Sequence, residues 1–288
     1  MFKGQWKPIR FSFFFVGMTF GTLMTVRSNR LWEQRNQDWV SLIFSRPKQL
    51  KPIDWLPEPL SNIYEIISHQ WKSSSEAQKL AISLISTNAL VFFSWQIPLF
   101  SRFMHRHFAH DPLSGKGYTL LTSTFSHQGV MHFGFNMYAL HGFLPHLEIR
   151  SGMSWEQTLA FYLSAGVLAS LGSHLLSLAL WKRGLRTIAP SLGASGGIWA
   201  VLVGTAMVDP YANAGIIFIP GVSFTLSELV PALVALDFLG VVRRWQTFDH
   251  IAHLSGAFVG YWYLQFGPDW WSKIQLQWYK ARLEASRK

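Results

Sequence analysis

Seven long apolar stretches, separated by polar segments, constrain the fold of this chain more than any other feature. They cover approximately residues 11–26, 80–100, 130–147, 158–180, 195–208, 226–242 and 250–266. A helix crosses a bilayer with about 20 apolar residues, and in lipid every backbone N–H and C=O must find its partner within a helix or a closed barrel. The sequence therefore predicts an all-α polytopic membrane protein.

Composition and charge agree with a membrane protein and exclude several other classes. Only 14% of the 288 residues are charged, against about a quarter in soluble domains. The net charge is +10, but the basic residues flank the apolar stretches, which indicates contact with anionic lipid and argues against a nucleic-acid partner. Because the chain has no cysteine, a disulfide framework and a zinc site with Cys ligands are excluded.

Four segments follow from this pattern. Residues 1–27 are expected to form a basic segment with a retained first transmembrane helix, and residues 80–267 a core of six helices. Between them, residues 28–79 form a polar linker, in which residues 55–71 are amphipathic and suit the membrane surface. Residues 268–288 are expected to be a basic amphipathic tail whose aromatic side chains lie at the interface.

Four polar residues are predicted to meet at one membrane face. In the six-helix core, His132 and Asn136 open the second helix. Ser195 opens the fourth helix, and His253 lies near the start of the sixth. Because each crossing reverses the direction of the chain, these three helices run parallel and begin at the same face.

Each of the four residues has a possible role in acyl transfer. Ser195 is the candidate nucleophile, and His253 is the candidate general base that takes its proton and later protonates the leaving amine. His132 and Asn136 share one helix face and can donate hydrogen bonds to an oxyanion. The backbone N–H of Ser195, at a helix start, can do the same. Such a mechanism needs no metal and no cofactor.

The backbone before Ser195 is expected to be irregular. The segment from Pro190 to Ala194 precedes a short apolar helix. Irregular backbone at membrane depth survives only when it is buried in protein or lines a water-filled cavity. A cavity at this place would supply both water and unpaired N–H groups.

Small residues are expected to bring the serine helix and the histidine helix together. Gly256 and Gly260 share a helix face with His253. On the serine helix, Ala200 and Gly204 form a pair of small residues one turn apart. Small side chains let two helix backbones approach closely in lipid.

Three motifs, in this order, resemble those of the rhomboid family of intramembrane serine proteases. They are His132-Phe133-Gly134-Phe135-Asn136, Gly193-Ala194-Ser195-Gly196 and Ala252-His253-Leu254-Ser255-Gly256. The resemblance covers roughly residues 80–267. It implies a six-helix rhomboid core, a dyad of Ser195 and His253, and cleavage of single-span membrane proteins within the bilayer.

Further segments are similar to the mitochondrial presenilin-associated rhomboid-like branch of this family. They cover residues 121–127, 161–166 and 248–250. The extra apolar stretch before the core also fits this branch, as one N-terminal transmembrane helix plus six. The resemblance suggests the mitochondrial inner membrane.

The chain departs from the pattern of the family in two places. It lacks the Trp-Arg pair that many bacterial rhomboids carry before the second core helix. Ser255 stands where relatives often have glycine, and we expect this serine to loosen the packing behind His253.

Other polar residues near the dyad have competing interpretations. His250 is the main rival for the general base, although the glycines that follow His253 favour His253. Asp237 lies in an apolar stretch, where a carboxylate is costly unless paired, and is interpreted as a structural or gating contact. Trp199 either packs in the core or stacks on the imidazole of His253.

Histidines outside the dyad are interpreted as structural. His105, His107 and His110 could suggest a metal site, but they lie beside arginines in what reads as a solvated basic loop. His127 is expected to shape the loop before the second core helix.

The distribution of basic residues predicts an orientation. Parity places the candidate site on the same face as residues 1–10. Basic residues on this face are Lys3, Lys7, Arg10, Arg102, Arg106, Lys116, Lys182, Arg183, Arg186, Arg243 and Arg244. The short loops opposite hold only Arg150, so the N-terminus and the site are expected to face the matrix.

The leading interpretation is a serine endopeptidase whose partners are single-span membrane proteins and the lipid bilayer. The alternative is a non-catalytic relative that binds membrane helices and controls their trafficking or stability. A transporter ranks third, because the sequence has no inverted repeat and no row of charged pore residues. The oligomeric state stays open.

Overall fold

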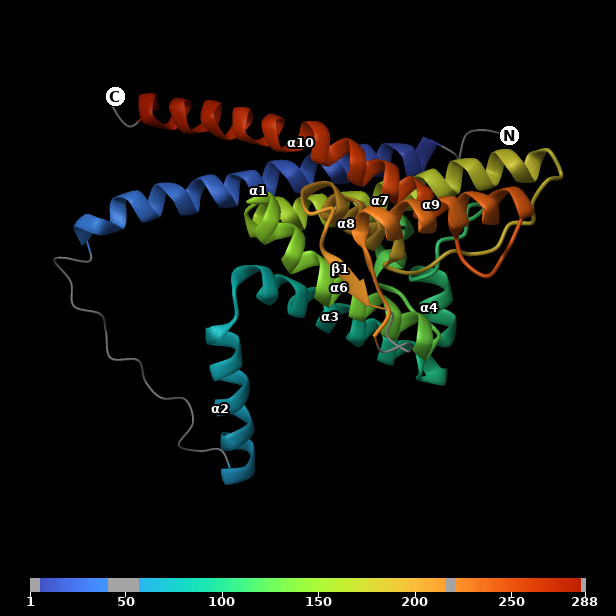
Figure 1. The fold of residues 1–288 in the computed structure, drawn as a ribbon, viewed down its shortest axis with the longest axis horizontal. Helices are drawn as coiled ribbons and strands as arrows, with labels where there is room; N and C mark the ends of the chain where they lie inside the picture. Colours follow the sequence, from blue (N-terminus) through green and yellow to red (C-terminus); the bar gives the residue numbers. More distant parts are fainter. Residues whose placement is uncertain (1–5, 41–56, 216–220, 286–288) are drawn as a thin grey trace.

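The computed structural model describes residues 6–40, 57–215 and 221–285, and every predicted apolar stretch lies largely on one of its helices (Figure 1). In chain order the elements are α1 (Trp6–Val40), α2 (Glu58–Ser73), α3 (Glu76–Trp95), η1 (Pro98–Phe100), α4 (Ser101–His107), α5 (Thr119–Thr122), η2 (Ser123–Phe125), α6 (Val130–Ser151), α7 (Trp155–Lys182), α8 (Ser195–Val208), β1 (Asn213–Gly215), β2 (Ser223–Thr225), α9 (Leu226–Arg243) and α10 (His250–Ala285). The helical polytopic membrane fold is confirmed. The strands β1 and β2 add a small antiparallel hairpin.

Three of the described helices are long and apolar enough to cross a membrane. These segments are Trp6–Gln34 in α1, Glu76–Trp95 in α3 and Trp155–Lys182 in α7. The apolar helix α8 has 14 residues and is about 21 Å long, less than the hydrocarbon core of about 30 Å. In α6, α9 and α10 the fold buries polar side chains that lower the hydropathy, among them Asn136, Asp237 and His250.

Local sequence explains where several of these helices begin and end. At the start of α9, Thr225 and Glu228 form a capping box, in which the backbone N–H of Thr225 donates to Glu228 Oε2 at 3.0 Å. Ser75 and Gln78 form the same motif before α3. Gly152 ends α6 with a φ of +69°, a left-handed conformation that glycine adopts without strain.

The serine helix α8 lies inside the bundle, packed against α6, α7 and α10. Its contact with α10 is made through glycine, as predicted. A Cβ atom on Gly256 would lie 2.0 Å from the carbonyl oxygen of Gly196, and one on Gly260 would lie 2.4 Å from that of Ala200. Only a hydrogen atom fits at these two positions, so the sequence of α10 permits backbone contact with the serine helix.

The packing behind His253 differs from the expectation at Ser255. A Cβ atom on Gly172 in α7 would lie 2.3 Å from Ser255 Oγ. The serine side chain therefore fills space that Gly172 leaves open. The predicted loosening is wrong, because a second glycine on the facing helix compensates for the one that is missing from α10.

The helices α1 and α10 are longer than the sequence analysis expected. They continue past residues 27 and 267, and their distal halves project side by side beyond the bundle (Figure 1). Arg282 of α10 donates to Asn29 and lies over the rings of Trp32 and Trp278, 5.2 and 5.1 Å from the centroids. These contacts, and not hydropathy, sustain the helices outside the apolar stretches.

Within the predicted linker, α2 forms a separate amphipathic helix. None of its residues is buried, and its exposed apolar side chains include Ile63, Ile66, Ile67 and Trp71. Figure 1 shows α2 running across the direction of α1 and α10. A position on the membrane surface stays a prediction. Residues 28–40 of the predicted linker belong to α1, and its residues 41–56 lie outside the described residues.

Candidate active site

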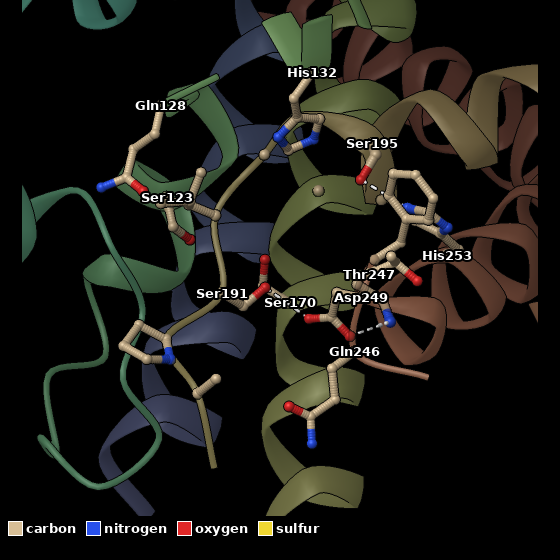
Figure 2. A pocket seen from close by; sticks show the side chains of 18 of the residues that line it. Ser123, Gln128, His132, Ser170, Ser191, Ser195, Gln246, Thr247, Asp249 and His253 are labelled. Atoms are coloured by element: carbon tan, nitrogen blue, oxygen red, sulfur yellow. Dashed lines mark hydrogen bonds between the residues drawn. The ribbon is translucent and has the colours of Figure 1, made fainter. Parts of the chain in front are cut away.

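A polar pocket of about 360 Å³ opens where α8 and α10 begin (Figure 2). Its wall comes from the loops before these two helices, with contributions from η2, α6 and α7. The polar side chains that line it are Ser123, Gln128, His132, Ser170, Arg186, Thr187, Ser191, Ser195, Gln246, Thr247, Asp249 and His253. The segment from Pro190 to Gly193 is irregular and lines this pocket, as predicted.

Ser195 and His253 face each other in this pocket. Ser195 is the first residue of α8, and His253 lies in the first turn of α10. Ser195 Oγ lies 2.9 Å from His253 Nε2, which is hydrogen-bonding distance (Figure 2). A neutral imidazole with its proton on Nδ1 accepts the serine proton at Nε2. The fold therefore brings together Ser195 and His253, two of the four residues that parity predicts at one membrane face.

The ring of Trp199 covers the candidate base. It stacks on His253 with 5.4 Å between the ring centroids and 28° between the planes. Trp199 is one turn after Ser195 on α8 and also packs against the cluster of Leu202 and Val203. Both interpretations offered for Trp199 therefore hold, and the ring restricts the rotamers open to the imidazole.

The other nitrogen of His253 faces a carboxylate. His253 Nδ1 lies 3.1 Å from both Oδ1 and Oδ2 of Asp237 on α9. Asp237 Oδ1 also lies 2.5 Å from Nδ1 of His250, one turn before His253. The link between Asp237 and the base was not predicted from the sequence. The signal that could have found it was an acidic residue in the middle of the apolar stretch 226–242, beyond the first helical turn that holds Glu228.

His250, the rival base, is directed toward Asp237. A Cβ atom on Gly240 would lie 2.6 Å from the His250 ring, so the imidazole is packed against the backbone of α9. Its ring contacts Asp237, Trp245, Phe248 and His253. His253, and not His250, is within reach of Ser195.

His132 and Asn136 lie in different surroundings: His132 lines the pocket, whereas Asn136 is buried. His132 lines the pocket with Ser195, and a Cβ atom on Gly193 would lie 3.0 Å from His132 Nε2. Gly193 has a φ of +135°, a conformation that favours glycine. Asn136 is buried one turn deeper and donates from Nδ2 to the backbone oxygen of His132 at 2.7 Å. Of this pair, His132 is the residue that faces the pocket.

The loop before Ser195 is anchored on its inner side. The N–H of Gly193 donates to the backbone oxygen of Ser123 at 2.9 Å. The N–H of Ala194 donates to His127 Nε2 at 3.3 Å. His127, which was expected to shape the loop before α6, therefore also holds the loop before Ser195. Burial, and to a lesser degree the nearby His132, lowers the pKa of His127 to about 3, so that its ring is neutral and can accept.

A second anchor lies near the pocket floor. Asp249 Oδ2 accepts hydrogen bonds from Ser191 and Ser173 at 2.6 Å each. Asp249 Oδ1 accepts from the N–H of Ala252 at 3.1 Å, in the first turn of α10. Asp249 therefore links the loop before the serine helix, α7 and the histidine helix.

The histidine-rich segment differs from the solvated loop that the sequence suggested. His110 is buried, with Nδ1 2.8 Å from Thr119 Oγ1 and Nε2 2.9 Å from His174 Nδ1. Burial, and then the nearby His174, lowers the pKa of His110 to about 3. His107 instead lies 2.8 Å from the hydroxyl of Tyr118. The prediction of a solvated loop is wrong for His110, because tertiary packing covers it.

One group of side chains among the described residues has the geometry to hold a metal ion. Asp237, His250 and His253 place one ligand atom each within 4.8 Å of one another. A cation there would replace the hydrogen bonds from the two imidazoles to the carboxylate. It would also bind His253 at Nδ1, which leaves Nε2 facing Ser195.

The bundle of membrane helices and the serine–histidine contact at its polar pocket define the class of protein. Residues 114–267 match the family model of the Rhomboid domain, and the chain belongs to the rhomboid family. It is similar to "Presenilin-associated rhomboid-like protein, mitochondrial" of Mus musculus, with 34% identity over 292 residues, 98% of this chain and 73% of the relative. The resemblance seen in the motifs is confirmed.

Two further relatives match a smaller share of the chain. "Presenilin-associated rhomboid-like protein A, mitochondrial" of Danio rerio is 39% identical over 200 residues, 69% of this chain and 50% of the relative. "Rhomboid protein 1, mitochondrial" of Saccharomyces cerevisiae is 32% identical over 195 residues, 65% of this chain and 54% of the relative.

Proposed function

We propose that the chain is an intramembrane serine endopeptidase that uses Ser195 and His253 on transmembrane segments of single-span proteins. The observation that carries the proposal is the 2.9 Å contact between Ser195 Oγ and His253 Nε2 inside a polar pocket. Membership of the rhomboid family supports it. The names of the relatives support a mitochondrial membrane, and we propose the inner membrane, with the site facing the matrix.

The reaction proceeds by acyl transfer. Ser195 Oγ attacks the scissile carbonyl carbon while His253 Nε2 takes the hydroxyl proton, which forms a tetrahedral oxyanion. We assign the donors for this oxyanion to the backbone N–H of Ser195, at the start of α8, and to the ring of His132, which lines the pocket. We assign Asn136 the supporting role of fixing the helix turn that carries His132.

Two further steps complete the turnover. Protonated His253 gives its proton to the leaving amine, the C–N bond breaks, and the acyl group remains as an ester on Ser195. Water entering the polar pocket then attacks the ester, with His253 again as base, and restores the hydroxyl. The proton of Ser195 leaves on the amine, and His253 restores the hydroxyl with a proton taken from the attacking water, so the cycle needs no metal and no cofactor.

The substrate segment must unwind near the cut. In a transmembrane helix each carbonyl is hydrogen-bonded along the helix and enclosed by side chains, so a nucleophile cannot reach it. We therefore expect cleaved segments to contain residues that destabilise helices, such as glycine or proline.

Cleavage after reconstitution tests the proposal. The full chain in liposomes should cut a single-span substrate, and Ser195→Ala and His253→Ala should each lower the rate by at least about 10³-fold. Ser94→Ala on α3 is the matched control, because Ser94 Oγ bonds only to Leu90 of its own helix. It should keep the parent rate. Undiminished cleavage by either site variant rejects the dyad.

Binding of the substrate without cleavage by the parent chain gives the opposite result. It would favour the alternative, a non-catalytic relative that holds membrane helices and controls their trafficking or stability.

A further inference from the structure

Asp237 lies in a buried part of an apolar helix, where an ionised carboxylate costs free energy unless it is paired. It is in the middle of α9, flanked by Leu236 and Phe238, and only 5% of its surface is exposed. An ionised carboxylate in an apolar, buried place is retained when charged or strongly polar partners satisfy it. Here the partners are two imidazoles from α10, one of which is the proposed catalytic base.

We propose that Asp237 positions His253, so that the proposed dyad works as a triad in this chain. This inference rests on the proposed function. His253 has a carboxylate at Nδ1 and a hydroxyl at Nε2, at 3.1 and 2.9 Å. A carboxylate only accepts hydrogen bonds, so it holds the proton on Nδ1. Nε2 is then left with the lone pair that must accept the proton of Ser195.

The same carboxylate acts a second time during turnover. Once His253 has taken the serine proton, the ring is an imidazolium with both nitrogens protonated. Asp237, which is buried, lies against its Nδ1–H and stabilises this positive charge. The opposite tautomer, with the proton on Nε2, would point a donor at Ser195 and could not act as base.

His250 keeps the carboxylate in place. Its Nδ1 donates to Asp237 Oδ1 at 2.5 Å, and its ring fits against the bare backbone of Gly240. Asp237 comes from α9 and both histidines from α10, so the packing of these two helices brings the three groups together. His250 supports Asp237 without contacting Ser195.

Two readouts test this positioning role in the full chain reconstituted in liposomes. One is cleavage of a single-span substrate, resolved into kcat and KM. The other is the rate at which a fluorophosphonate probe labels Ser195, which reports the reactivity of the serine without any substrate helix. Thermal unfolding of each variant is followed in parallel, so that a loss of fold is recognised.

Asp237→Asn should lower both kcat and the labelling rate by about 10²–10⁴-fold, with KM and the unfolding temperature little changed. The amide can present N–H₂ to His253 and so favour the wrong tautomer. Asp237→Glu should recover part of the labelling rate, because it restores a carboxylate. Asp269→Asn, at an exposed position of α10, is the matched control and should label at the parent rate.

Three results would overturn the inference. Asp237→Asn with kcat and labelling within about twofold of the parent shows that the carboxylate is not used. Loss of activity with an equal loss of folded protein, without recovery in Asp237→Glu, shows a purely structural cross-link. Loss of labelling when EDTA is added to the parent shows that Asp237 is a metal ligand.

The two readouts separate this inference from the proposed function. A parent chain that labels at Ser195 but does not cut the substrate overturns the protease proposal. Sensitivity of that labelling to Asp237→Asn still supports the triad. A parent chain that neither labels nor cuts overturns both.

Discussion

At the scale of single residues, the site depends on the protonation of its histidines. His253 needs a neutral ring with its proton on Nδ1 to act as base. His127 needs a neutral ring to accept the N–H of Ala194, next to the nucleophile. The fold secures the second condition by burial, which lowers the pKa of His127 to about 3. His253 and His127, both near the nucleophile, therefore have different tasks, one in proton transfer and one in holding the loop.

The buried loop histidines predict how stability depends on pH. His127 and His110 have a pKa of about 3 in the folded chain, against an ordinary value of 6.5 that we assign to the unfolded chain. Between these values the unfolded state binds more protons, so stability falls as the pH is lowered from about 6.5 toward 3. Above about 6.5 this contribution is complete.

Thermal unfolding in detergent between pH 7.5 and pH 4.5 measures this effect. The unfolding temperature should decrease steadily below about pH 6.5, and His127→Gln should decrease less steeply because one of the two titrating groups is gone. A parent chain whose unfolding temperature is flat or rises over this range contradicts the prediction.

At the scale of elements, glycine decides whether the nucleophile meets its base. Ser195 and His253 lie on different helices, and their contact requires α8 and α10 to touch through backbone atoms. Gly256 and Gly260 permit that approach on one side of α10. On the facing helix α7, Gly172 permits the contact with Ser255. The place where α8 begins matters equally, because its first residue, Ser195, lines the pocket.

Gly256→Ala tests this contact. The added methyl group would lie 2.0 Å from the carbonyl oxygen of Gly196, which is backbone and cannot rotate away. We expect a loss of about 1–3 kcal/mol in unfolding free energy and a slower reaction of Ser195 with a fluorophosphonate, since the helices must separate.

Gly142→Ala in α6 is the matched control for this prediction. A Cβ atom there meets nothing within 4 Å, and alanine favours the helix by about 0.5–1 kcal/mol over glycine. Stability should be unchanged or slightly higher. A Gly256→Ala chain as stable and reactive as the parent would show that the two helices do not need this contact.

At the scale of the whole molecule, the contacts of α1 bear on the predicted membrane orientation. Trp6 and Ile9 at the start of α1 line one pocket with Lys182 and Arg183 at the end of α7. The start of α1 also packs at Gly117, just before α5 and η2, the element that holds Gly193. The beginning of α1 and the candidate site therefore lie at the same end of the bundle (Figure 1).

Protease protection of a tag at each end of the chain tests the orientation. In mitoplasts, a tag at the N-terminus should be protected and one at the C-terminus should be digested, since we expect α10 to carry the chain to the other face. A protected C-terminus with an exposed N-terminus would reverse the orientation and place the site in the intermembrane space.

By itself the sequence determined the class of fold and indicated Ser195 and His253 as the two residues of the candidate dyad. The lengths of the apolar stretches predict membrane helices because lipid leaves the backbone no other partner. The direction of successive crossings then places Ser195, His253 and His132 at one face without any coordinates. The spacing of small residues also predicts that the serine helix and the histidine helix touch, because small side chains let two helix backbones approach closely.

Only the tertiary structure decided which partners the other polar residues have. Asp237 and His253 come from different helices, and the rotation of α9 about its axis, which the sequence does not encode locally, turns the carboxylate to Nδ1. The same holds for the burial of His110 and for the room that Gly172 gives Ser255. Such contacts depend on side chains from distant segments, so hydropathy and spacing along one helix do not predict them.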